Sequence, residues 1–328
     1  MLQKTLKLNT EDRKATRDGF GIGLVEVAKK DERVVALTAD LKESTRVEQF
    51  AQEFPNRFFE MGVAEQNLVT VASGLANYGK IPFVTSYATF SPGRNWEQIR
   101  TTVCINDVPV KIIGCHAGLT VGPDGSTHQA LEDIAIMRTL PNMMVVVPCD
   151  SEESYKATLA IAQHPPAGGK PAYLRLGREK MPQVTTAETP FELGKAYYVY
   201  ETENADVTIV ACGSLVYESI LAAQELGMNE GLNIDVINIH TIKPIDREII
   251  VNAAKKTKAI VTAEEHQIMG GLGSTVAEVL AEEYPTPIEF IGVRDQYGQS
   301  GTPAELMRHY KLDKESIKIA VRDILTKR

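Results

Sequence analysis

The sequence of 328 residues contains little cysteine, a single tryptophan and no excess of positive charge. Its four cysteines show no Cys-x-x-Cys pair and no metal-ligand spacing, and three of them lie in or beside apolar runs. We therefore expect buried thiols and no metal or redox site among them. The net charge of −8 argues against nucleic acid or an anionic membrane as the main partner, but leaves room for a locally positive anion site.

Long apolar runs are also missing. No stretch approaches the roughly 20 residues of a membrane span, and the opening residues MLQKTLK lack the apolar core of a secretion signal. The sequence therefore predicts a cytoplasmic protein without a membrane partner. With 43% hydrophobic and 24% charged residues it has an ordinary globular composition, and it is long enough for two domains with full cores.

Helical and continuously apolar segments alternate along the chain, which predicts α/β architecture with mostly parallel sheets covered on both faces. The helices expected in the first block lie near 16–30, from 64, from 92, near 129–139 and near 152–163. The strands expected there are Val34–Thr38, Pro82–Ser86, Val110–Gly114, Met143–Val147 and Ala172–Leu176. A second block repeats the pattern with strands near Val207–Ala211, Ile234–Ile239, Ala259–Ala263 and Ile288–Val293, so we expect a smaller, independent sheet.

Residues typical of turns and helix ends lie between these segments and support a division into two domains. The polar, irregular stretch from Gly177 to about Leu193 is interpreted as a linker between two domains. Ser91 followed by Pro92 predicts a capped helix with proline at its first position. Asp246 is interpreted as a helix entry, and the glycine-rich turn at 264–273 lacks the third glycine of a nucleotide-binding motif.

One carboxylate stands at the start of an otherwise apolar helix of small residues. The apolar positions that recur there at helical spacing are Leu68, Val69, Val71, Ala72, Leu75 and Ala76. This helix should be largely buried, with Glu65 in its first turn. Glu65 is a candidate catalytic group, although a glutamate in a first turn often only complements the helix dipole.

Several segments, taken in order, resemble the C-terminal half of a transketolase. They are Asp40–Ser44, Gly62–Gln66, Tyr87–Phe90, His116–Gln129 and Tyr173–Arg178. The resemblance covers nearly the whole chain and implies a pyrimidine-binding domain over 1–185 and a transketolase C-terminal domain over 186–328. Both are parallel-sheet α/β domains in that family.

The resemblance implies a cofactor site for thiamine diphosphate, which lies between two domain types in that family. The glutamate matching Glu65 hydrogen-bonds ring nitrogen N1′ of the aminopyrimidine, and this activates the cofactor. Tyr87 and Phe90 match aromatic positions that pack against the pyrimidine, although both could be ordinary core aromatics. Asp40 would approach the cofactor across a subunit boundary, or it could cap the helix that follows its loop.

The resemblance also implies substrate contacts on a long, glycine-rich loop. His116 would contact the substrate phosphate, Asp124 the hydroxyl next to the donor carbonyl, and His128 would assist proton transfers at the reacting oxygens. His116 and His128 are thus candidate catalytic groups, whereas a lone histidine on a loop is more often a structural hydrogen-bonder.

Basic and hydroxyl side chains complete the constellation at the far end of a sugar phosphate. Arginine offers a planar fork that fits phosphate oxygens, and serine adds one donor. The residues assigned to this end are Arg17, Ser44, Arg175 and Arg178. A surface salt bridge is the alternative for these arginines, above all for Arg175.

A missing motif matters as much as those present. Thiamine enzymes mark their diphosphate-binding domain by Gly-Asp-Gly, which holds magnesium, and this sequence has none. The resemblance therefore implies that another polypeptide supplies Mg²⁺ and the diphosphate half, as in split transketolases. The partner would be an N-terminal diphosphate-binding subunit, and the assembly a dimer of heterodimers.

The function implied is transfer of a two-carbon ketol unit from a ketose phosphate to an aldose phosphate, as in the pentose phosphate pathway. The β subunit of a 2-oxo acid dehydrogenase is an alternative, but usually carries a different segment at 124–129. Deoxyxylulose-phosphate synthase is another, but tends to place arginine where His116 stands and carries both halves on one chain. A non-catalytic scaffold of the same fold also remains open.

Overall fold

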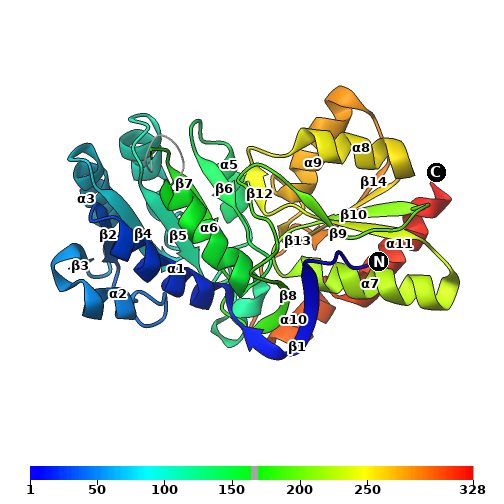
Figure 1. The fold of residues 1–328 in the computed structure, drawn as a ribbon, viewed down its shortest axis with the longest axis horizontal. Helices are drawn as coiled ribbons and strands as arrows, with labels where there is room; N and C mark the ends of the chain where they lie inside the picture. The colour runs from blue at the N-terminus through cyan, green and yellow to red at the C-terminus, as the bar shows by residue number, and fades with distance from the viewer. Residues whose placement is uncertain (164–168, 328) are drawn as a thin grey trace.

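The computed structural model describes residues 1–163 and 169–327, which form two α/β domains side by side (Figure 1). The first domain, coloured blue to green except for the yellow strand β12, has a seven-stranded sheet in the order β12-β6-β7-β5-β4-β2-β3. All neighbours are parallel except the edge pair β12 and β6. The strands are β2 (Val34–Thr38), β3 (Phe58–Glu60), β4 (Ile81–Tyr87), β5 (Lys111–Cys115), β6 (Met144–Val146), β7 (Ala172–Arg175) and β12 (Thr241–Lys243).

Helices cover both faces of this sheet. On one face lie α1 (Thr16–Lys30), α2 (Glu48–Glu53) and α6 (Ser151–Gln163). On the other lie α3 (Glu65–Asn77), α4 (Trp96–Gln98), a π-helix at Ile99–Cys104 and α5 (Asp133–Arg138). Short 3₁₀ turns occur at Pro55–Arg57 and Leu119–Asp124. Strand β2 serves both layers, because alternate residues of a strand point to opposite faces and all five are buried.

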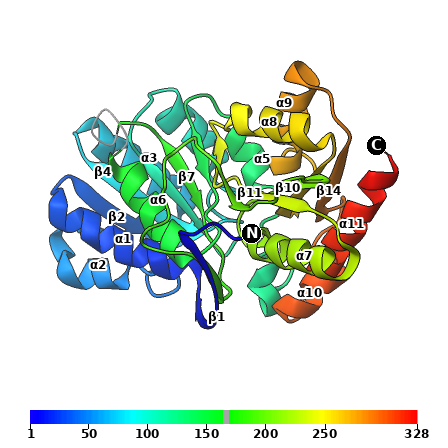
Figure 2. The ribbon, with the colours of Figure 1, turned by 45° about the vertical axis from the view of Figure 1, so that its right-hand side comes forward.

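The second domain has a five-stranded sheet in the order β14-β13-β10-β11-β9, parallel except for β9. Its strands are β9 (Tyr197–Tyr200), β10 (Val207–Ala211), β11 (Ile234–Asn238), β13 (Ile260–Gln267) and β14 (Ile288–Val293). Its helices are α7 (Leu215–Glu230), α8 (Arg247–Thr257), α9 (Leu272–Glu283), α10 (Pro303–His309) and α11 (Lys314–Thr326). Helices α8 and α9 lie above the sheet and α7 and α11 below it (Figures 1 and 2).

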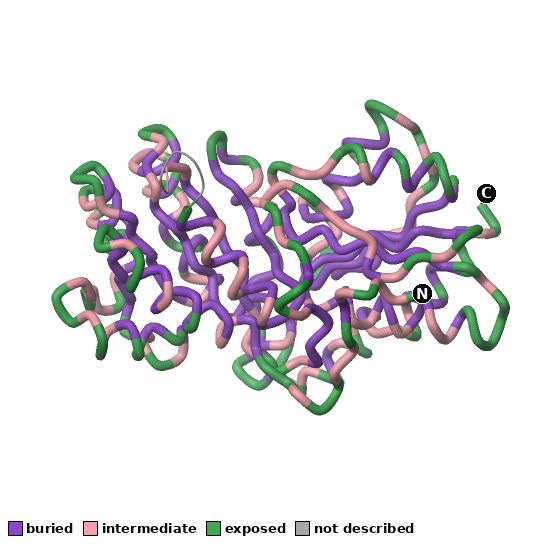
Figure 3. Tube along the Cα trace, in the orientation of Figure 1, coloured by how far each residue is buried: buried purple, intermediate pink, exposed green. Residues whose placement is uncertain are grey.

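The predictions of two mostly parallel α/β domains and of a smaller, separate second sheet are confirmed. The chain between the second domain's strands also supplies β12 to the first sheet, where it pairs with β6 so that Thr241 lies opposite Val146. One hydrophobic cluster joins Leu37 of the first sheet to Ile250 of α8 and Val276 of α9. The central strands of both sheets are buried along most of their length (Figure 3). The two domains therefore share a core.

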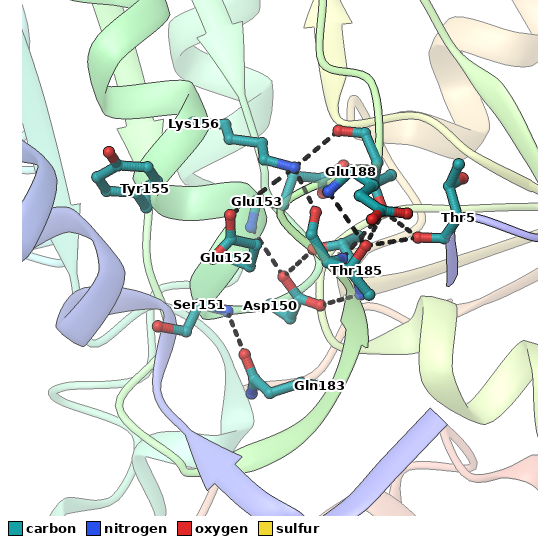
Figure 4. Close-up of polar contacts among 12 residues, drawn as sticks. Thr5, Asp150, Ser151, Glu152, Glu153, Tyr155, Lys156, Gln183, Thr185 and Glu188 are labelled. Atoms are coloured by element: carbon teal, nitrogen blue, oxygen red, sulfur yellow. Dashed lines mark hydrogen bonds and ion pairs between the residues drawn. The ribbon is translucent and has the colours of Figure 1, made fainter. Parts of the chain in front are cut away.

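The segment interpreted as a linker contains a strand. Strand β8 (Met181–Thr185) pairs antiparallel with β1 (Leu6–Lys14) in a two-stranded ribbon. Asp150, just before α6, accepts hydrogen bonds from the backbone N–H groups of Val184 and Thr185 and from the Thr185 hydroxyl (Figure 4). Polar side chains therefore fasten this ribbon to the first domain, which apolar periodicity could not predict.

The predicted helix start at Ser91–Pro92 is wrong. The peptide bond between these residues is cis, and the helix begins only at Trp96. The backbone N–H of Ser91 instead donates to the carbonyl of Tyr87, so the chain first makes a turn. Because of this turn, Arg94 and Asn95 lie beside Glu65 at the start of α3.

Other expectations concern single features. All four cysteines are buried and free, as predicted. Asp246 does begin α8, since its side chain accepts a hydrogen bond from the backbone N–H of Ile249. Within the residues that the structure describes, no helix is both long and apolar enough to cross a membrane.

Candidate active site

The candidate residues gather where neighbouring parallel strands end. Asp40 follows β2, Tyr87 ends β4 and His116 follows β5, and these three strands are adjacent in the sheet. Open parallel sheets bind ligands at this carboxyl edge, because the connecting loops diverge there and leave a crevice. The topology thus brings together segments that lie far apart in the sequence.

Glu65 is the first residue of α3, and it is 1% exposed. Its Oε2 accepts a hydrogen bond of 2.8 Å from Nη1 of Arg94, and its backbone carbonyl accepts one from Nδ2 of Asn95. Among the described residues no donor reaches its Oε1. The carboxylate is therefore buried and fixed in direction, with one oxygen left for a ligand. A glutamate that only complements the helix dipole needs no arginine partner, so the ion pair with Arg94 is a further feature of this site.

Arg94 was not predicted from the sequence. It comes from the turn that replaces the expected helix, and its guanidinium also lies 4.9 Å from the ring centroid of Phe90. Half of its side chain is exposed. No local signal in the sequence marks this residue, because its approach to Glu65 depends on the path of the turn.

Tyr87 and Phe90 form an aromatic wall beside this carboxylate. Their ring centroids are 6.3 Å apart and both residues are half-buried, with Tyr87 packed against the core of the first domain. His116 stacks on Tyr87 at 3.9 Å, and His128 meets Phe90 edge-on at 5.4 Å. The wall therefore joins the region of Glu65 to both candidate histidines.

His116 is held as a neutral hydrogen-bond donor. Burial and the nearby Arg17 lower its pKa to about 3. Nη1 of Arg17 lies 3.2 Å from its Nε2, and because a guanidinium only donates, Nε2 accepts and the ring proton sits on Nδ1. That Nδ1 is buried and has no partner among the described residues. A buried donor without a partner at this position suits a ligand oxygen.

A cavity of about 280 Å³ opens next to His116. Its lining consists of Arg17, Glu43, Ser44, Arg46, Tyr87, His116, Asp124 and Arg178. The predicted convergence of Arg17, Ser44, His116 and Arg178 is confirmed, whereas their role in binding phosphate stays a prediction. Arg46 was not predicted to line this cavity. Its backbone is left-handed, with φ of 66°, and no feature of the sequence indicates this conformation.

Contacts within this cavity hold the arginines in place. Arg17 donates from Nη1 to the carbonyl of Ser44, and its Nε is buried without a partner among the described residues. Arg178 donates from Nη1 to the carbonyl of Val121 and lies 3.6 Å from Asp124. Arg46 pairs with Asp18 at 2.7 Å, whereas Arg17 forms no ion pair among the described residues, so the charge of Arg17 is available to an anion.

Arg175 lies elsewhere. It is buried, and its Nε pairs with Asp133 at 2.8 Å while its Nη2 donates to the backbone carbonyl of Glu265 in the second domain. The alternative of a surface salt bridge is wrong, because this pair is deep between the domains. The structure does not bring Arg175 to the cavity of Arg17 and Arg178.

Asp40, Asp124 and His128 are accessible. Asp40 is exposed, with a left-handed φ of 60°, and its backbone N–H donates to Oε1 of Glu60. It does not cap α2, whose first flanking residue is Val47. The Nδ1 of His128 lies 2.9 Å from the hydroxyl of Thr127. Their predicted roles concern a ligand and stay predictions.

Two family models match the chain. The transketolase pyrimidine binding domain matches residues 12–183, and the transketolase C-terminal domain matches residues 194–317. The chain therefore belongs to the transketolase family, whose members depend on thiamine diphosphate. It is more specifically a C-terminal transketolase section, as the following relatives show.

These relatives include proteins that match this chain over nearly their whole length. The 6-deoxy-6-sulfo-D-fructose transketolase subunit SqwH of Clostridium sp. is 40% identical over 94% of this chain and 94% of its own length. A solved split gene transketolase, described as an inactive beta4 tetramer, is 44% identical with a TM-score of 0.87, over 95% of this chain and 98% of that one. Human transketolase is 34% identical over 96% of this chain but only 50% of its own length.

Proposed function

We propose that this chain is the C-terminal subunit of a two-subunit transketolase that transfers a ketol unit from a ketose phosphate to an aldose phosphate. The observation that carries the proposal is Glu65, buried and oriented by Arg94 with Oε1 free, beside the wall of Tyr87 and Phe90. The match to split transketolase subunits over nearly their whole length favours a split transketolase over the dehydrogenase and synthase alternatives.

The residues fit the pyrimidine half of thiamine diphosphate. When bound, the cofactor supplies the nucleophilic carbon that no side chain provides. Glu65 would hold a proton at ring nitrogen N1′ through Oε1, and burial strengthens that hydrogen bond because water cannot compete for it. Tyr87 and Phe90 would orient the ring and exclude water. Asp40, exposed at the same edge, would meet the cofactor of a neighbouring copy.

The remaining residues would bind and position the sugar phosphates. Arg17, Arg46 and Arg178 would meet the phosphate, together with the Ser44 hydroxyl and the Nδ1 proton of His116. Asp124, paired loosely with Arg178, would accept a hydrogen bond from the hydroxyl beside the donor carbonyl. His128 would exchange protons with the reacting oxygens from the loop above the wall.

Magnesium and the diphosphate site would come from an N-terminal partner subunit, because this sequence lacks Gly-Asp-Gly. The solved split relative is described as an inactive tetramer of β chains. We infer that this chain alone likewise self-associates without activity, and that pairing with its partner gives a dimer of heterodimers.

A reconstitution experiment tests this proposal. The chain alone, the partner alone and their mixture would be compared for magnesium-dependent thiamine diphosphate binding and for ketol transfer from a ketose phosphate. We expect both properties only in the mixture. Tight cofactor binding by the lone chain contradicts the split site. Release of carbon dioxide from a 2-oxo acid would instead favour the dehydrogenase, and inactivity of the mixture with every donor would favour a scaffold.

A further inference from the structure

The loop that carries the candidate histidines has little regular structure of its own. This histidine loop, residues 116–131, connects β5 to α5 and carries His116, Asp124 and His128. Its regular structure is one 3₁₀ turn, Leu119–Asp124, and one isolated bridge that does not involve these three residues. The position of such a loop depends on the side chains and neighbouring elements that bond its backbone groups.

The second domain supplies such bonds from the last residues of β13, at both ends of the loop. Near the beginning of the loop, Oε1 of Glu265 accepts the backbone N–H of Thr120 at 2.7 Å. At the end of the loop, the backbone N–H of Gln267 donates to the carbonyl of Leu131 at 2.8 Å. A strand of the second domain therefore fastens a loop of the first.

The contact made by Glu265 is buried and fixed in direction. Glu265 is 5% exposed, and its Oε2 accepts the hydroxyl of Ser214 at 2.6 Å, so both carboxylate oxygens have donors. Gly118 packs so closely on this carboxylate that a Cβ there would lie 2.3 Å from Oε1, and its φ is 86°. Both features require glycine at this position of the loop.

The histidine loop lies between two cavities. His116 and Asp124 line the cavity of Arg17 and Arg178, whereas Ala117 and Thr120 line a larger cavity of about 520 Å³ between the two domains. The two linings have no residue in common. Because of the larger cavity the loop is not packed solidly against the second domain at Thr120, so its position there depends on the bond to Glu265.

We propose that Glu265 is a positioning residue for ketol transfer, which it serves by holding the backbone of Thr120 so that Asp124 and His128 are aligned with the donor substrate. Glu265 does not line the cavity of the substrate phosphate, so it acts through the loop and not on the substrate. This inference rests on the proposed function. It gives the second domain a part in the reaction.

Loss of this contact should separate two steps of the reaction. The residues that fit the cofactor, Glu65, Tyr87 and Phe90, do not lie on the histidine loop. Activation of the cofactor should therefore stay normal when the loop is released. The residues assigned to the donor substrate do lie on it, so transfer should fall. A general loss of structure would instead reduce both steps.

Kinetics of the reconstituted enzyme test the proposal. Glu265→Ala should lower kcat/KM for a phosphorylated donor by about ten- to a hundredfold per folded enzyme, because a small misplacement of reacting groups is costly. Deuterium exchange at the thiazolium carbon of the bound cofactor should stay normal. Glu265→Gln should restore most of the transfer, because its amide oxygen can accept the Thr120 N–H and its amide nitrogen can donate to the Ser214 hydroxyl.

The adjacent glutamate offers a matched control. Glu264 is equally buried in β13, but its carboxylate bonds the start of α9 and not the histidine loop. Glu264→Ala should therefore lower stability and leave kcat/KM per folded enzyme normal. Gly118→Ala reaches the same contact from the loop, since its Cβ would displace the loop from Glu265, and it should lower kcat/KM as Glu265→Ala does. This variant also serves if Glu265→Ala does not fold.

Hydrogen exchange of the lone chain, followed by mass spectrometry, reports on the loop without the reaction. Peptides within 117–131 should exchange faster in Glu265→Ala than in the wild type, because the loop opens more often. They should exchange at the wild-type rate in Glu264→Ala.

Three results in an active reconstituted enzyme would overturn the role of Glu265 alone. The first is a normal kcat/KM in Glu265→Ala although the loop exchanges faster. The second is an equal loss of ketol transfer and of thiazolium exchange. The third is failure of Glu265→Gln to restore transfer. An inactive wild-type pair would instead contradict the proposed function, and the role of Glu265 in transfer with it.

Discussion

The carboxyl edges of the two sheets hold buried glutamates in opposite states. At the first sheet, Glu65 has one oxygen paired with Arg94 and the other free, and the nearby Nδ1 of His116 has no partner among the described residues. At the second sheet, both oxygens of Glu264 accept backbone N–H groups at the start of α9, from Leu272 and Gly273. The same architecture thus gives an oriented but incomplete site in one domain and a satisfied structural contact in the other.

Backbone geometry shows the same contrast. Asp40 and His116, at the first edge, have left-handed φ values of 60° and 55°. Such values are uncommon outside glycine, and they persist where surrounding contacts hold them. Glu264 and Glu265 lie in strand β13 without left-handed backbone, although the pairing of β13 with β14 is irregular between Ala263 and Gln267. Left-handed backbone and a buried donor without a partner among the described residues therefore coincide at the first edge, which is why we place the chemistry there.

The largest predicted effect is on stability, and it tests the buried ion pair of Arg175 and Asp133 between the two domains. Asp133→Ala should destabilise the protein by about 3–5 kcal/mol, because Arg175 would be left buried without its partner. Urea unfolding at fixed protein concentration measures this. Asp12→Ala removes an exposed pair with Lys14 and should cost at most about 1 kcal/mol. A near-normal stability of Asp133→Ala, with a raised KM for phosphorylated donors, would return Arg175 to the substrate site.

Glu65→Gln tests the incomplete carboxylate. The change is nearly isosteric but removes the charge that would hold a proton at N1′, so turnover of the reconstituted enzyme should fall on the order of a hundredfold or more. Deuterium exchange at the thiazolium carbon of the bound cofactor, followed by NMR, should slow in parallel. Unchanged exchange would leave Glu65 with a role at the helix dipole alone.

Glu264→Gln is the matched control for that change. Glutamine cannot accept both backbone N–H groups through its amide, so stability should fall while turnover per folded enzyme stays normal. Burial raises the pKa of Glu264 to about 7, whereas an unfolded glutamate titrates near 4.5. The unfolded chain releases this proton first, so the contribution of Glu264 to stability should decline as pH rises from about 4.5 to 7. The variant should lose that slope.

The sequence predicted the regular elements because buried parallel strands are continuous apolar runs. Val34–Thr38, Val207–Ala211 and Ile288–Val293 have the predicted bounds. The ribbon of β1 and β8 was missed, since it is polar and is fastened by Asp150 through contacts distant in sequence. Among site residues, the sequence predicted those on the recognisable segments. Arg46 and Arg94 were missed because backbone conformation directs their side chains to the site. Arg46 is itself left-handed, and Arg94 lies in the turn before α4.

The phosphate cavity tests whether the first edge is built for an anion. Arg178→Ala should raise the KM for a phosphorylated donor by an amount equivalent to about 1.5–3 kcal/mol, since a charge-assisted contact is lost. His116→Ala and Arg46→Ala should act in the same direction. With erythrulose, which has no phosphate, the changes should matter much less.

Arg33→Ala, which removes an exposed pair with Asp31, is the control for these arginine variants and should alter neither KM. Equal losses with erythrulose and with the phosphorylated donor would contradict the assignment. The natural donor would then be a free sugar, and the three guanidinium groups would serve another purpose, such as holding the loop.

The smallest predicted effect concerns how helices begin in the two domains. Asp313 caps α11 by accepting the backbone N–H of Ser316, whereas α3 starts after Ala64, which offers no such acceptor. Asp313→Ala should cost about 1 kcal/mol, and Ala64→Ser should gain roughly 0.5–1 kcal/mol, because a serine hydroxyl can accept an orphan N–H. Urea midpoints at fixed protein concentration would show the opposite signs.

The two variants should also differ in the turnover of the reconstituted enzyme. Asp313→Ala should leave turnover normal. Ala64→Ser should lower it, because the new hydroxyl competes with the ligand for hydrogen bonds beside Glu65. If Ala64→Ser gains stability at full turnover, the open start of α3 is unrelated to the chemistry, and the contrast between the two edges rests on Glu65 and His116 alone.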